Sequence, residues 1–148
     1  MTDYELTQRA IGCAMKVHSA LGPGLLESAY KECLCFELNR AGLFAEKEKP
    51  MLLVYSEVKL DCGYRVDIMV ERRLILEIKA VEAINDVHLA QGLTYLKLAN
   101  LRLGLILNFH VVHLRTGIRR VVNKYDDSAS FAESSAPSAV IHPSYQDQ

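Results

Sequence analysis

Two runs near the middle of the chain carry charged side chains at a spacing suited to metal chemistry. Residues 64–70 and 74–80 are rich in residues that favour strands, and three residues separate them. If those three form a hairpin loop, Asp67 is predicted directly opposite Glu77, with the two Cβ atoms roughly 5 Å apart. Lys79 follows Glu77 by two residues. Its side chain therefore points to the same face of the strand.

Like charges opposite one another destabilise a sheet, so Asp67 and Glu77 need a compensating charge. A divalent cation, with Lys79 as a second positive charge, would provide it. The alternative is that these three side chains form the solvated face of a hairpin. The run 74–80 favours a site, because it is apolar on both sides and charges in buried strands are rare unless paired or metal-bound. A two-residue loop would instead place Asp67 opposite Leu76.

Apolar periodicity predicts the elements that would position these residues. The predicted elements are helices over 5–21, 25–41 and 88–98 and strands over 51–55, 64–70, 74–80, 103–108, 111–114 and 118–122. Gly22-Pro23-Gly24 separates the first two helices, and Gly42 is placed to end the second. The last two strands should form a closing hairpin around residues 115–117. This order predicts an α/β fold of the α+β type.

Length and composition predict one domain followed by a tail. A chain of 148 residues, half of them apolar, can bury one ordinary core, which we assign to residues 1–124. Residues 125–148 are rich in Ser, Ala, Pro, Asp and Gln without periodicity and are predicted to be disordered. No apolar run approaches the roughly 20 residues that span a bilayer, and the first residues lack a signal-peptide pattern. We therefore expect a cytoplasmic protein without a membrane partner.

The charge distribution permits a nucleic-acid partner, although the net charge is −1. Residues 1–122 contain 16 basic and 14 acidic residues, a net charge of +2, because four acidic residues lie in the tail. Metal binding by three of the acidic residues would make the remaining surface more positive.

Other candidate metal ligands are discounted. The cysteines, which form no CxxC pair, are interpreted as reduced thiols; they are Cys13, Cys33, Cys35 and Cys62. His18 is a lone helical histidine, which is usually structural. His110 and His113 would lie on opposite faces of a strand.

At this point the sequence resembles a known family. Residues 24–30 (GLLESAY) resemble the signature of the bacterial GxxExxY proteins, and Asp67 with EIK at 77–79 resembles their form of the PD-(D/E)XK nuclease core. The resemblance extends over about residues 6–122 and departs from the superfamily's name at Val66, where that name has proline. It implies a restriction-endonuclease-like core, a mixed central sheet flanked by helices, with the acidic residues on adjacent central strands.

The resemblance also implies roles for residues outside the two strands. Glu27 corresponds to the helical acidic residue of the superfamily, although an acid in the first turn of a helix can equally be a partner of the helix dipole. Gln91 and Tyr95, one turn apart, resemble a Gln-x-x-x-Tyr motif that lies beside the active site in exonuclease-like branches. With Tyr30 of the signature, they are expected to position substrate.

These residues predict a metal-dependent phosphodiesterase of the nuclease type. Carboxylates of Glu27, Asp67 and Glu77, with the carbonyl of Ile78, would suit one or two Mg²⁺ (or Mn²⁺) ions, which prefer oxygen. Lys79 would orient or deprotonate the attacking water, or hold a phosphoryl oxygen. The expected partner is DNA or RNA, with a homodimer or a protein partner supplying specificity. The alternatives are a binding module that keeps the fold without cleaving, and a protein-interaction module.

Overall fold

The computed structural model describes residues 1–61 and 63–124. In chain order the elements are α1 (Asp3–Leu21), α2 (Glu27–Arg40), β1 (Ala45–Pro50), β2 (Leu53–Tyr55), β3 (Val58–Leu60), β4 (Arg65–Val70), β5 (Leu74–Lys79), α3 (Asp86–Ala99), β6 (Leu103–Asn108), η1 (Leu114–Gly117) and β7 (Ile118–Val122).

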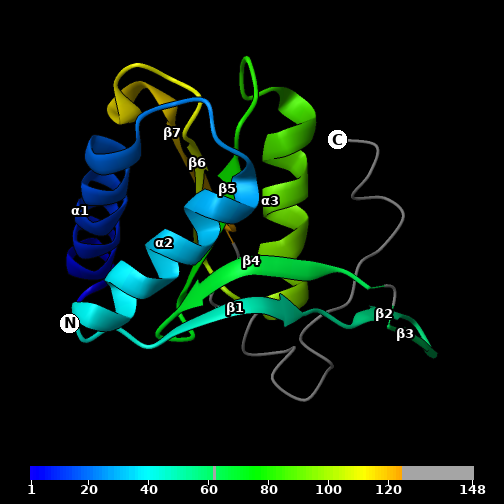
Figure 1. The fold of residues 1–148 in the computed structure, drawn as a ribbon. Coiled ribbons are helices and arrows are strands. Elements are labelled where there is room, and N and C mark those ends of the chain that lie inside the picture. Colours follow the sequence, from blue (N-terminus) through cyan, green and yellow to red (C-terminus); the bar gives the residue numbers. More distant parts are fainter. Residues whose placement is uncertain (62, 125–148) are drawn as a thin grey trace.

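The centre of the molecule is a five-stranded mixed sheet in the order β1-β4-β5-β6-β7. The β5–β6 pair is parallel, and the other neighbouring pairs are antiparallel. The strand expected over 51–55 is shorter, and as β2 it pairs only with β3, in a two-stranded sheet that projects from the body (Figure 1). The mixed sheet and its flanking helices confirm the expected fold class.

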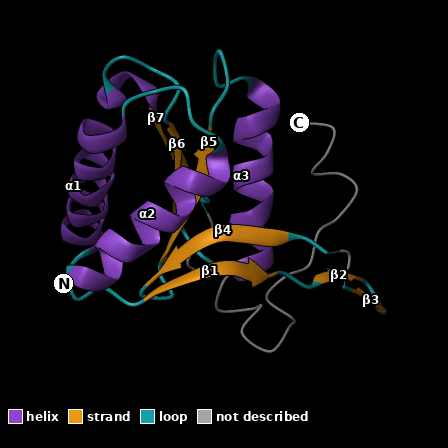
Figure 2. Cartoon of the chain, viewed as in Figure 1, coloured by secondary structure: helices purple, strands orange, loops and turns teal. Residues whose placement is uncertain are grey.

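The helices cover the two faces of the sheet separately (Figure 2). On one face, α1 and α2 pack over a large core that includes Leu34, Leu76 and Leu107. On the other face, α3 packs over a smaller core through Tyr95 and Leu96. Every residue of β5 before Lys79 is buried. Both faces of β5 are covered by helices, so a charged side chain in residues 74–78 is surrounded by other protein groups and not by solvent.

Local sequence accounts for the ends of the first two helices. Thr2 and Glu5 form a capping box at the start of α1. Gly42 adopts φ 84° directly after the α2 cap, the left-handed conformation that glycine tolerates best. The buried face of α2 consists of Tyr30, Leu34, Cys35 and Leu38, whereas Cys33 is exposed.

The register predicted for the β4–β5 hairpin is confirmed. Val70 pairs with Leu74 and Ile68 pairs with Leu76, as a three-residue loop requires. Glu71 and Arg72 in that loop both have φ 53°, which reverses the chain in a short distance. The loop length thus places Asp67 and Glu77 at matching positions on the two strands.

Two strands, β1 and β3, were not predicted. The charged segment 46–50, for which the sequence predicted no element, lies in β1 and pairs with β4. Because β1 is at the edge of the sheet, its charged side chains can reach solvent and α2. Lys47 pairs with Glu32, and Lys31 pairs with Glu48 at 3.3 Å. Ion pairs, and not buried apolar side chains, connect β1 to α2, so this strand lacks the apolar alternation from which strands are usually predicted.

The predicted closing hairpin is wrong. Residues 111–114 form no strand, and β7 pairs instead with β6. Leu114 is buried, which draws this segment toward the core. Gly117 passes so close to β6 that an added Cβ would lie 2.3 Å from the carbonyl oxygen of Asn108. The lack of a side chain at this glycine lets the chain return directly along β6.

No helix among the described residues is long and apolar enough to cross a membrane. The predicted disordered tail, residues 125–148, lies outside the described residues.

Candidate active site

The site lies where β4 separates from β5. Backbone pairing ends at Ile68 and Leu76, and side chains connect the strands beyond that point. The Oδ2 atom of Asp67 accepts a hydrogen bond from the N–H of Ile78 at 2.7 Å. The Oε1 atom of Glu77 accepts one from the N–H of Asp67 at 3.4 Å. The two carboxylates are thus held in the opening, each on a backbone amide of the opposite strand.

Glu77 is the most perturbed ionisable group in this opening. Its exposed fraction is 5%. Burial, followed by the negative charge of Asp67, raises the pKa of Glu77 from 4.5 to about 8. The N–H of Asp67 and the positive charge of Lys79 oppose this rise only in part. Without a cation, the Glu77 carboxyl is therefore mainly protonated at neutral pH.

A chain of polar side chains leads from the end of β5 to α3. The Nζ atom of Lys79 donates to Oε1 of Gln91 at 3.3 Å, and Nε2 of Gln91 donates to the Tyr95 hydroxyl at 3.2 Å. Burial raises the pKa of Tyr95, and the charges of Glu77 and Asp67 raise it further. The structure thus brings Gln91 and Tyr95 to the acidic pair and connects them to Lys79.

Glu27 reaches the same strand from the other side of the sheet. It is the first residue of α2, and its Oε2 atom accepts a hydrogen bond from the N–H of Ala80 at 3.1 Å. This carboxylate lies at the positive end of the α2 dipole and also next to the end of β5. Both roles considered for Glu27, dipole partner and metal ligand, are compatible with this position.

The donor set suits a hard divalent cation. Asp67, Glu77 and Glu27 offer carboxylate oxygens beside the last residues of β5 and Ala80, which follows it. Oxygen is the ligand that Mg²⁺ prefers. Across residues 1–61 and 63–124, no group of three His, Cys, Asp or Glu side chains is arranged to hold a metal. Each of the three carboxylates instead accepts a backbone N–H. A buried carboxyl beside a second carboxylate is nevertheless a setting in which a cation replaces a proton.

Tyr30 does not lie where the sequence predicted. It is fully buried and stacks on Phe109, with ring centroids 4.5 Å apart. Its hydroxyl donates to the carbonyl of Gly22 at 2.6 Å and accepts from the N–H of Leu25 at 3.1 Å. Contact between Tyr30 and substrate does not fit this placement. The residue instead holds the turn before α2, and that turn positions Glu27.

Two further residues at the site were missed. Asn108 at the end of β6 is buried, and its side chain bonds both the N–H and the carbonyl of Val81, at 3.1 and 2.9 Å. These two bonds have the pattern of strand pairing, and they hold the backbone of Val81 just after Lys79. The available signal was a polar residue ending an apolar run. Tyr64, just before β4, is 43% exposed, and its ring lies 6.4 Å from that of Tyr95.

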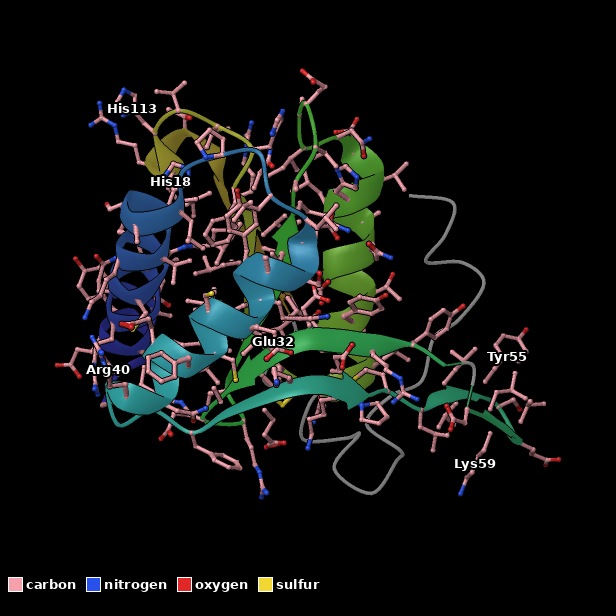
Figure 3. All side chains as sticks on the ribbon, viewed as in Figure 1. His18, Glu32, Arg40, Tyr55, Lys59 and His113 are labelled. Atoms are coloured by element: carbon pink, nitrogen blue, oxygen red, sulfur yellow. The ribbon has the colours of Figure 1, made fainter. Side chains whose placement is uncertain are left out.

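The candidate histidines, with Cys13 and Cys35, have contacts away from the acidic pair, and Cys62 lies outside the described residues. His18 is buried, and its Nε2 lies 2.9 Å from the carbonyl oxygen of Val111, in agreement with a structural role. His113 is exposed near the end of α1 (Figure 3). His110 is 3.9 Å from the exposed carboxylate of Glu82. Burial raises the pKa of the Cys13 and Cys35 thiols, which agrees with reduced, unreactive cysteines.

Comparison with known proteins identifies the superfamily. The sequence model of the PD-(D/E)XK nuclease superfamily matches residues 4–121, a range that contains Glu27, both strands of the acidic pair and α3. Comparisons with curated proteins and with solved structures gave no match. Because the matched range covers most of the sequence and includes the whole site, the chain belongs to the PD-(D/E)XK nuclease superfamily.

Proposed function

We propose that this protein is a divalent-metal-dependent nuclease that hydrolyses phosphodiester bonds of nucleic acid. The observation that carries the proposal is the buried pair of Asp67 and Glu77, with Lys79 beside it, at the opening between β4 and β5. A non-catalytic binding module would have no use for two close carboxylates that raise the pKa of one of them. Membership of a nuclease superfamily supports the same reaction.

Asp67, Glu77 and the carbonyl of Ile78 would hold Mg²⁺ or Mn²⁺, with Glu27 as a further oxygen ligand. A bound cation would neutralise the negative charge on the phosphoryl oxygens and activate the attacking water. Lys79 then has its ammonium group available to orient the water or a non-bridging oxygen. Gln91 holds that ammonium group by its side-chain carbonyl, and Tyr95 holds Gln91.

We also propose the narrower GxxExxY assignment, because the residues of that motif act together in this fold. Gly24 has φ 106°, a conformation in which a residue with a side chain would be strained. The hydroxyl of Tyr30 ties together Gly22 and Leu25 in the same turn. The turn delivers Glu27 to the N–H of Ala80 at the end of β5. Gly24 and Tyr30 thus stabilise the turn that positions the carboxylate of Glu27 at the site.

A cleavage assay with a metal series tests the proposed function. Labelled single- and double-stranded DNA and RNA are incubated with the protein in Mg²⁺, Mn²⁺ or EDTA, and products are separated by size. We expect cleavage only with metal, and loss of at least a hundredfold in rate for Asp67→Asn and for Lys79→Met, within the range removed with single charge-stabilising groups elsewhere. Glu57→Gln is the matched control, since Glu57 is exposed on the β2–β3 hairpin.

Two results would contradict the proposal. Cleavage that continues unchanged in EDTA would remove the role of the metal. Activity that survives in Asp67→Asn would show that a contaminating nuclease or another site is responsible. Binding without cleavage of any of these substrates would favour the binding-module alternative.

A further inference from the structure

The positive charge of this chain is segregated along the sequence. Residues 87–124, which form most of α3 together with β6, η1 and β7, contain no Asp or Glu. They contain six of the 17 lysines and arginines. Residues 1–86 contain the other 11 together with 14 acidic residues. Residues 87–124, about a quarter of the sequence, therefore carry a net charge of +6, although the whole chain carries −1.

The ion pairs follow the same division. Seven cations of the first part lie within 4 Å of an acidic side chain; they are Lys16, Lys31, Arg40, Lys47, Lys49, Arg72 and Arg73. Five exposed cations of the later segment form no ion pair with any residue in 1–61 or 63–124. These five define the β7 surface: Arg102, Arg115, Arg119, Arg120 and Lys124. Within the described part of the chain, no acidic side chain neutralises their charge.

A comparison of the two edges of the sheet separates this pattern from ordinary edge protection. Charged side chains on an edge strand prevent pairing with other chains, and either sign serves that purpose. The β1 edge uses both signs, and Lys47 and Lys49 are neutralised by Glu32 and Glu46. The β7 edge has Arg119 and Arg120, which form no ion pair with any acidic residue in the described ranges. One-signed charge adds self-repulsion that edge protection does not require.

The register connects the β7 surface to the site. Glu77 pairs with Ile106 across β5 and β6, and Ile106 pairs with Arg119 across β6 and β7. Directly paired residues share a face, so Arg119 lies level with Glu77, two strand spacings or about 9.6 Å away. Arg120 points to the other face, toward the side covered by α1 and α2. Arg119 therefore connects the β7 surface to the site at the edge of the sheet.

We infer that the β7 surface binds the phosphate backbone of nucleic acid and so holds the substrate against the site. Five exposed cations that no described acidic residue neutralises would bind a polyanion. Only the identity of the polyanion rests on the proposed function. The contacts would be to phosphates rather than bases, since arginine and lysine on an open edge offer charge without a groove-reading element.

The test is a binding measurement that needs no cleavage. Fluorescence anisotropy of labelled 20-nucleotide single-stranded and duplex DNA is followed with the full chain in EDTA, over a series of salt concentrations. The test variant is Arg119→Gln with Arg120→Gln. The control is Lys16→Gln with Arg40→Gln, which removes the same charge from the ion-paired face; Arg40 lies at the end of α2 (Figure 3). A second test variant is Arg115→Gln with Lys124→Gln, which leaves β7 unchanged.

We expect the test variants to weaken binding by about tenfold or more near 0.1 M salt, and to reduce the slope of log affinity against log salt by about 2. The control should change either quantity little. Melting temperatures within about 3 °C of wild type would show that the edge strand is intact.

Four results would overturn the inference. They are absence of nucleic-acid binding by the wild type at low salt, equal loss of binding in test and control variants, unchanged binding in both test variants, and competition by polyglutamate as effective as that by unlabelled DNA. The result also separates the two proposals. Binding that depends on the β7 surface in a protein that cleaves nothing leaves this inference standing and removes the nuclease activity. Metal-dependent cleavage together with unchanged binding in the test variants would support the nuclease activity and contradict the role of the β7 surface.

Discussion

Replacing Glu77 by glutamine should change how the stability of the metal-free protein depends on pH. The pKa of Glu77 is raised to about 8 in the folded state, whereas an unfolded chain has a value near 4.5. A raised pKa means that the folded state holds the proton more tightly. The resulting stabilisation is complete below about pH 4.5 and is lost as the pH rises through about 8. Glu77→Gln carries no ionisable group there and should lack this loss.

The size of the effect follows from the shift. The difference between 4.5 and about 8 corresponds to at most ~5 kcal/mol, at ~1.36 kcal/mol per unit. By proton linkage, about 3 kcal/mol of this stabilisation is lost as the pH rises from about 5 to about 8. For a domain of this length, that amounts to a fall of roughly 6–12 °C in melting temperature.

The assay is thermal or urea unfolding of wild type and Glu77→Gln in EDTA, at several pH values from about 5 to about 8. The expected result is that the wild type loses stability relative to the variant as the pH rises. Other groups titrate in both proteins, so the difference between them isolates Glu77. Glu57→Gln is the control, because Glu57 is exposed and should leave the wild-type dependence unchanged.

Excess Mg²⁺ provides the second half of the experiment. At about pH 8 it should restore much of the lost wild-type stability, because a cation that binds the folded state alone stabilises it. The variant, with one carboxylate fewer, should respond less. Parallel pH curves for wild type and Glu77→Gln in EDTA would refute the reasoning, since they would mean that Glu77 is not held protonated by burial and by Asp67.

Three other variants and one truncation test the remaining parts of the site. Asp67→Asn should leave the melting temperature of the metal-free protein equal or higher, because its amide oxygen can still accept a hydrogen bond from Ile78 while the charge beside Glu77 is removed. The same variant should lose the rise in melting temperature that Mg²⁺ causes. A metal-free variant clearly less stable than the metal-free wild type would contradict repulsion within the acidic pair. Gln91→Ala should slow cleavage several-fold without changing metal affinity measured by calorimetry, because its contact is to Lys79. Tyr30→Phe should lower the unfolding free energy by about 1–3 kcal/mol in urea titrations, since two backbone groups lose their partner. Deletion from Ser128 onward should leave the melting temperature within a few degrees of the full chain, because that segment lacks apolar periodicity.

The acidic pair could be predicted from sequence because its cause is local. The register of a hairpin depends on loop length, and the three residues between the two runs place Asp67 at the level of Glu77. The apolar composition of β5 likewise predicted its burial, and the spacing of Gln91 and Tyr95 predicted their shared helix face. Each of these inferences needs only neighbours within about ten residues.

The features that sequence analysis missed depend on contacts between distant segments. The strand β1 forms because the edge of a sheet tolerates charge and because α2 supplies partners for its lysines. Tyr30 was expected to position substrate, yet packing against Phe109 places it in the core. A motif pattern does not distinguish a residue that touches substrate from one that holds such a residue in place.

Charge shows the same division between local and tertiary causes. Sequence alone determined that residues 87–124 contain no acid and that Glu77 is followed by a lysine two residues later. Only the tertiary structure decided that most cations of residues 1–86 form ion pairs, while those along β7 form none with other described residues. It also decided that burial raises the pKa of Glu77 to about 8. The physical reason is that burial and electrostatic energy depend on distances through space, which the fold sets and the order of residues along the chain does not.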